Sequence, residues 1–140
     1  MQQNDGLRPM DRQECLRLLA DVPVGRVVYT RQALPAVLPV NFALDADASV
    51  LVRTSAGSDL VKAVDGFVVA FEADEFDTAR RSGWSVVVTG QATVVTDPAE
   101  HERLLRSGPR SWMPIRDDVF LRIESTVVTG RELNDLDGIG

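Results

Sequence analysis

The chain has 140 residues, with 15 Lys and Arg against 21 Asp and Glu, so its formal charge is −6. An acidic chain is poorly suited to nucleic acid or to an anionic membrane surface, because both attract positive charge. A single cysteine and a single histidine exclude an internal disulfide and a Cys/His metal cage. The N-terminus lacks a signal-peptide pattern, and no apolar run approaches the roughly 20 residues that span a bilayer. We therefore expect one cytoplasmic domain over residues 1–140, with an ordered core at about 11–131 and a tail at 132–140.

The first predicted element is a helix that begins after Asp11. Asp11 and Glu14 form a capping box, and apolar residues then recur every three or four positions as far as Val22. Pro23 ends the helix, because the residue before a proline avoids the helical region. A short run of strand-forming residues follows at 26–30.

The clearest periodicity lies between residues 34 and 45, where apolar residues alternate with prolines and polar residues. Period 2 predicts a strand. Pro35 and Pro39 cannot donate to a neighbouring strand, so an edge or a bulge is expected beside them. A turn at 45–48 leads to a returning strand at 49–54, and the two strands form a hairpin.

The rest of the chain predicts three more strands and two more helices. The expected order is a short helix at 59–65 closed by Gly66, a strand at 67–72, a loop at 73–83, a long strand at 84–96 bent at Gly90, a helix from 97 to about 108, a strand at 119–128 and a fraying tail after Gly130. Hairpins and loops connect the strands, without regular alternation of strand and helix. This order favours a mainly β fold, an antiparallel barrel of about six strands with helices at its ends.

No nucleophile elbow, Walker loop, zinc-protease motif or dinucleotide fingerprint is present, so any chemistry has to come from a bound cofactor. The strongest candidate site is Arg53-Thr54-Ser55, at the end of a strand and before a helix. A guanidinium, two hydroxyls and free backbone N–H groups can hold a phosphate, and Lys62 can add a second cation. The alternative is an ordinary helix cap beside a solvated arginine.

Three further segments are candidates for a pocket. Val40-Asn41-Phe42 can offer unpaired backbone groups to the edge of a planar ring, or can be an irregular edge strand with Phe42 buried. Trp84 can form one wall of a pocket, and Ser85 can hydrogen-bond into that pocket, although a tryptophan that starts a strand is more often part of the core or an interface. Trp112 lies in an apolar loop that a partner subunit would cover.

Six short motifs occur in a characteristic order. They are G-R-V at 25–27, L-P-V-N-F at 38–42, V-L-V-R-T at 50–54, V-A-F-E-x-D at 69–74, G-W-S-V-V-V-x-G at 83–90 and T-G-R at 129–131. In this order the segments resemble the pyridoxamine 5′-phosphate oxidase-like proteins, in particular their nitroimidazole-reductase-like and actinobacterial branch. The resemblance runs from about residue 11 to residue 131.

The resemblance implies an FMN-binding split β-barrel that forms a homodimer with flavin sites at the subunit interface. The residues that it assigns to the flavin are Arg53, Thr54 and Ser55 for the phosphate, the main chain of Val40, Asn41 and Phe42 for the isoalloxazine, Trp84 and Ser85 beside the ring, and Trp112 from the other subunit. One position differs, because Asp59 stands where relatives carry a lysine. A carboxylate repels a phosphate, so three alternatives stay open: Lys62 substitutes for the missing lysine, flavin binding is weak, or the ligand is a different one.

The expected function is a flavin (FMN)-dependent oxidoreductase that transfers hydride to or from a small planar substrate, with a nicotinamide or another electron donor. No catalytic side chain and no metal site are assigned. Two alternatives remain open. One is a flavin- or ligand-binding module without turnover, acting as a carrier, a sensor or an assembly protein. The other is a reductase of the same fold that uses a deazaflavin coenzyme.

Overall fold

The computed structural model describes residues 7–134. Within this range the chain forms eight strands and three helices. In chain order they are β1 (Arg8–Met10), α1 (Arg12–Leu19), β2 (Val24–Arg31), β3 (Leu34–Leu44), β4 (Val50–Ser55), α2 (Asp59–Val64), β5 (Val68–Asp77), β6 (Ser82–Val94), α3 (Pro98–Ser107), β7 (Asp118–Ile123) and β8 (Val127–Leu133). No helix in this part of the chain is long and apolar enough to cross a membrane.

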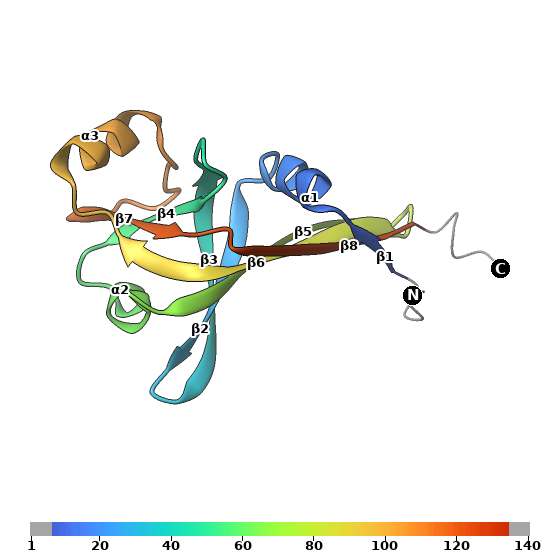
Figure 1. Ribbon diagram of the computed structural model, residues 1–140, viewed down its shortest axis with the longest axis horizontal. Helices are drawn as coiled ribbons and strands as arrows, with labels where there is room; N and C mark the ends of the chain where they lie inside the picture. Colours follow the sequence, from blue (N-terminus) through green and yellow to red (C-terminus); the bar gives the residue numbers. More distant parts are fainter. Residues whose placement is uncertain (1–6, 135–140) are drawn as a thin grey trace.

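Six of the strands close into an antiparallel barrel (Figure 1). The hydrogen-bonded order is β1-β8-β6-β5-β2-β3-β4-β7, and a further β6–β7 pairing closes the ring. β8 and then β1 extend the sheet beyond the barrel from β6. The predicted antiparallel barrel with peripheral helices is therefore confirmed.

β6 belongs to both parts of the sheet, and Gly90 makes this possible. Residues 83–89 of β6 pair with β8, whereas residues 92–94 pair with β7. Gly90 lies where the partner changes, and a Cβ at this position would collide with the backbone carbonyl of Glu124. The connection between β7 and β8 thus passes too close for any side chain.

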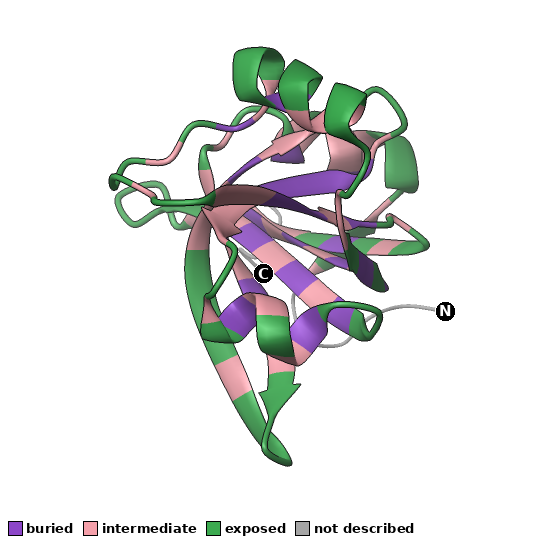
Figure 2. Cartoon of the chain, turned by 90° about the vertical axis from the view of Figure 1, so that its left-hand side faces the viewer, coloured by how far each residue is buried: buried purple, intermediate pink, exposed green. Residues whose placement is uncertain are grey.

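β3 has the open edge that its prolines predict. β2 pairs with residues 34–41 of β3, but β4 pairs only with residues 42–44. In the described chain, the β4-facing side of residues 34–41 is therefore unpaired. Pro35 and Pro39 lose no ladder hydrogen bond at an unpaired edge, so they are tolerated there. The β2–β3 hairpin projects from the barrel with mostly exposed residues (Figure 2).

The core fills the barrel and extends to two of the helices. Phe42 and Phe71 pack edge to face inside it, with ring centroids 4.6 Å apart. α1 and α2 contribute buried residues to the same cluster. α3 instead packs on the outer side of β4 and β7, through a separate cluster of Leu51, Leu104 and Phe120.

The three predicted helices are confirmed, and side chains cap their N-termini. The Asp11 carboxylate accepts from the Glu14 N–H at 2.8 Å. Ser58 and Asp97 cap α2 and α3 in the same way. Such caps satisfy N–H groups that have no partner inside the helix, which explains why these starts were visible in the sequence.

Three expectations about the strands are wrong, and one strand was missed. Residues 73–83 are not a loop, because β5 continues to Asp77 and β6 begins at Ser82. Continuous pairing between these strands outweighs the low strand propensity of Asp and Glu. The single strand expected at 119–128 is divided into β7 and β8, and β8 runs past Gly130 to Leu133. β1 was not predicted, and residues 135–140 of the expected tail lie outside the described residues.

Candidate functional site

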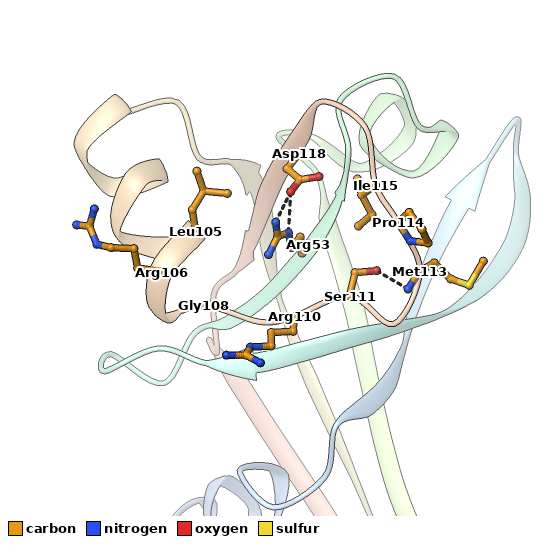
Figure 3. A pocket seen from close by; sticks show the side chains of 10 residues that line it. All are labelled: Arg53, Leu105, Arg106, Gly108, Arg110, Ser111, Met113, Pro114, Ile115 and Asp118. Carbon is orange, nitrogen blue, oxygen red and sulfur yellow. Dashed lines mark hydrogen bonds and ion pairs between the residues drawn. The ribbon is translucent and has the colours of Figure 1, made fainter.

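A cavity of about 380 Å³ lies between β4, α3 and the loop 108–117 that connects α3 to β7 (Figure 3). Arg53 and Asp118 form its base, Arg106 on α3 forms one side, and the loop supplies most of the remaining wall. Three arginines and one aspartate line the cavity, so its lining residues carry a net positive charge in an acidic chain. This arrangement suits an anionic ligand.

Arg53 is held in place by residues of the neighbouring strand. The β4–β7 register sets Arg53 opposite Phe120 and Ser55 opposite Asp118. Arg53 Nε donates to Asp118 Oδ2 at 2.9 Å, and Nη2 donates to the same oxygen. The guanidinium also lies 5.6 Å from the centroid of the Phe120 ring. Because these contacts fix it before any ligand binds, Arg53 is preorganised.

Asp118 has one oxygen that lacks a partner. Its Oδ1 is buried and receives no hydrogen bond from any described residue. A buried acceptor of this kind is costly unless a donor reaches it. The cavity therefore has a cationic group at its base, held by a carboxylate whose second oxygen is buried and without a donor.

Two further arginines surround the cavity. Arg106 is only loosely paired with Glu102, at 3.7 Å between exposed side chains. Arg110 lies on the loop, below Arg53 in Figure 3, and makes no ion pair with any described residue. Neither arginine nor Asp118 was predicted, since only the β4–β7 register and the course of the loop bring them to Arg53.

Asn41 and Trp112, both predicted site residues, meet beside this cavity. The Trp112 N–H donates to Asn41 Oδ1 at 2.9 Å. Asn41 Nδ2 donates in turn to the Pro23 carbonyl, at 3.4 Å. The loop that lines the cavity is thus tied to the open edge of β3, and Asn41, Arg53 and Trp112 share one neighbourhood.

The side chains of four other predicted residues do not line this cavity. Phe42 is buried in the core, and Val40 packs against that core. Thr54 Oγ1 lies 3.4 Å from Ser58 Oγ, and the Ser55 carbonyl accepts from the Ser58 N–H at 3.0 Å. Thr54 and Ser55 therefore serve the turn that leads into α2, as in the helix-cap interpretation.

Lys62 lies at a different cavity, which it shares with Arg31 and Asp59. Arg31 Nη2 is 3.0 Å from Asp59 Oδ2. Asp59 is therefore paired with a cation, because the β2–β3 hairpin brings Arg31 to it. The structure does not bring Lys62 to the cavity of Arg53.

Trp84 and Ser85 lie near the β5–β6 connection. Trp84 is 9% exposed, belongs to the core and lines a separate cavity there. Ser85 lies opposite Asp74 on the face that points away from the core. In Figure 1 this end of the sheet is opposite α3 along the long axis of the molecule. Within one subunit, these two residues are thus separate from Arg53.

A charged cluster on the outer face of the sheet was also missed by the sequence. Arg26 Nη1 lies 2.8 Å from Glu72 Oε1 and 3.3 Å from Asp74 Oδ2. Burial, and then the neighbouring Asp74 carboxylate, raise the pKa of Glu72 to about 7, although Arg26 lowers it. Arg26 and Glu72 meet only because the β2–β5 register sets them opposite each other. Glu72 and Asp74 share one cation, Arg26. When both carboxyl groups are ionised, the cluster therefore has a net negative charge.

The sequence of this chain is similar to those of known proteins. The family model described as pyridoxamine 5′-phosphate oxidase matches residues 11–132. The uncharacterised protein Rv0080 of Mycobacterium tuberculosis is 47% identical over 135 residues, which cover 86% of this chain and 82% of that protein.

Two solved structures are similar over nearly their whole length. The FAD binding protein from Mycobacterium smegmatis is 33% identical, with a TM-score of 0.71, over 91% of this chain and 99% of that chain. A FAD-binding protein (mll6688) from Mesorhizobium loti is 25% identical, with a TM-score of 0.75, over 91% of this chain and 99% of that chain. The chain described here belongs to the pyridoxamine 5′-phosphate oxidase family.

Proposed function

We propose that this protein binds a flavin, FMN or FAD, and uses it to oxidise or reduce a small planar substrate. The observation that carries the proposal is the preorganised Arg53 at the base of a positively charged cavity, beside the open edge of β3. The FAD-binding proteins of similar fold support a flavin as the ligand.

The cavity fits the ribityl phosphate part of a flavin. A phosphate matches the guanidinium groups of Arg53 and Arg110. A volume of about 380 Å³ also lies in the usual range for small-molecule sites. A ligand that carries a phosphate would thus match both the charge and the volume of the site.

The residues of this chain would bind and orient the flavin and shield it from water. A bound flavin supplies the hydride chemistry. Arg53 and Arg110 hold its phosphate, and the unpaired backbone groups of β3 are available to the polar edge of its ring. Trp112 and Met113 are 71% and 72% exposed, and they can cover the ring from the loop. Excluding water in this way strengthens the polar contacts of the site.

A second candidate is a flavin-binding module without turnover. Among the described residues that line the cavity, Asp118 is the only acid or base apart from the arginines, and Arg53 engages it. None of these lining side chains is therefore a free carboxylic acid or imidazole that could donate a proton. Rapid mixing with NADH and NADPH separates the two candidates, because an oxidoreductase bleaches the flavin absorbance and a binding module does not.

We also propose a homodimer, formed through the outer face of the sheet. Val37, Val68, Phe76 and Val127 share this face and are 52–69% exposed. Several large apolar side chains on one face are typical of an interaction surface. Such a dimer would cover the Arg26 cluster. Sedimentation equilibrium tests it: a Val37→Asp and Val127→Asp double variant should be monomeric, whereas a wild-type monomer would refute the proposal.

A further inference from the structure

The loop 108–117 is anchored at both ends. The Gly108 N–H donates to the Leu104 carbonyl at 2.8 Å, and the Asp117 carbonyl accepts from the Ala56 N–H at 3.0 Å. Pro109 is buried. These anchors do not explain the position of residues 110–116, the middle of the loop. This segment includes Arg110, which lines the cavity (Figure 3).

Residues 110–116 gain little from apolar burial. Trp112 and Met113 are both largely exposed, and the Met113 N–H donates within the loop, to Ser111 Oγ at 3.2 Å. Among the described residues, a single hydrogen bond ties this segment to the barrel, from the Trp112 N–H to Asn41 Oδ1. That bond is therefore the contact that holds residues 110–116 against the barrel.

The amide of Asn41 is itself oriented by the barrel. Its Nδ2 donates to the Pro23 carbonyl, which also accepts from the Phe42 N–H at 3.2 Å. With the NH₂ group directed to a carbonyl, the amide oxygen faces the loop. Asn41 also lies at the end of the unpaired stretch of β3, next to the residues that β4 pairs.

We propose that Asn41 is a positioning residue, whose amide latches the loop 108–117 onto the open edge of β3 and so holds Arg110 and Trp112 over the ligand. Its effect on flavin affinity rests on the proposed function. Without this hydrogen bond, the ends of the loop stay anchored, but residues 110–116 are free to move away from the barrel. Ligand binding then has to order these residues. Ordering a segment on binding lowers affinity.

Amide exchange tests the latch without any ligand. Asn41→Ala should speed exchange of the Trp112 amide by about 2- to 10-fold, the factor that one net hydrogen bond contributes. Asn41→Asp keeps an acceptor for the Trp112 N–H but loses the donor to the Pro23 carbonyl, so its exchange should be slower than in the alanine variant. Gln91→Ala is a matched control, because the Gln91 amide holds the Gly66 carbonyl at 3.0 Å outside this site. Unchanged exchange in Asn41→Ala, or exchange in Asn41→Asp as fast as in the alanine variant, would overturn the latch.

A flavin titration tests its consequence. The Kd for FMN should rise about 2- to 10-fold in Asn41→Ala and stay unchanged in Gln91→Ala. An equal Kd in wild type and Asn41→Ala overturns the role of the latch in binding. If wild type takes up neither FMN nor FAD while the exchange results hold, the proposed function fails and the latch stands.

Discussion

Replacing Glu72 with Gln should stabilise the protein more at alkaline than at acidic pH. The pKa of Glu72 is raised from 4.5 to about 7, first by burial and then by Asp74. Between these values the folded state keeps a proton that the unfolded chain releases. The free energy of unfolding therefore falls as the pH rises through this window, and the ionised carboxylate destabilises the folded state above it.

The size of the effect follows from the shift in pKa. The difference, 7 − 4.5, is about 2.5 units, which corresponds to roughly 3 kcal/mol at about 1.36 kcal/mol per unit. The side chain is 23% exposed in the single subunit, so water screens part of this cost there. We expect about 1–2 kcal/mol. Glutamine has the same shape, keeps an acceptor for Arg26 and does not ionise.

Urea unfolding at pH 5 and pH 8, at one protein concentration, measures this effect. The stability gain of Glu72→Gln over wild type should be about 1–2 kcal/mol larger at pH 8 than at pH 5. Glu75→Gln is the control, because Glu75 is exposed on the same strand. An equal gain at both pH values, or a loss of stability at pH 8, would refute the electrostatic reasoning.

Three further predictions concern the site and the fold. Arg110→Ala should weaken FMN binding by about 10-fold or more in a fluorescence titration, since a charge-assisted hydrogen bond is lost, whereas Arg116→Ala on the same loop should not. Burial raises the pKa of Asp45, but hydrogen bonds from Arg103 and Arg122 lower it to about 2. That pairing should contribute about 2 kcal/mol above pH 4 and be lost as the pH falls toward 2, so Asp45→Asn should flatten the acid limb of the stability profile. Gly90→Ala should cost more than about 3 kcal/mol in urea unfolding, because its Cβ meets the Glu124 carbonyl; a cost below 1 kcal/mol would contradict the observed β6–β7–β8 geometry.

Local patterns in the sequence were enough to predict the helices and the open strand. Asp11 and Asp97 cap their helices with side chains that lie three residues from the N–H groups they bind. The prolines of β3 report an unpaired edge, because each removes a donor. Such signals act over a few residues, so they can be seen without knowing the fold.

The contacts that define the site are not local. Arg53 and Asp118 are 65 positions apart, and Arg26 and Glu72 are 46 positions apart. Only the strand register brings each pair together. Arg31 and Asp59 also meet only in the folded protein, because the tertiary structure places the end of β2 beside the start of α2. The residues 73–83 were mistaken for a loop because polarity alone cannot distinguish a loop from a strand that is exposed on one side.

Titration of purified wild-type protein with FMN and with FAD tests the central claim most directly. The account predicts saturable binding of one flavin per subunit, with a perturbed visible spectrum and quenched flavin fluorescence, and weaker binding in Arg53→Ala and Arg110→Ala. Protein that takes up neither flavin, or whose affinity is the same in both arginine variants as in wild type, would contradict it.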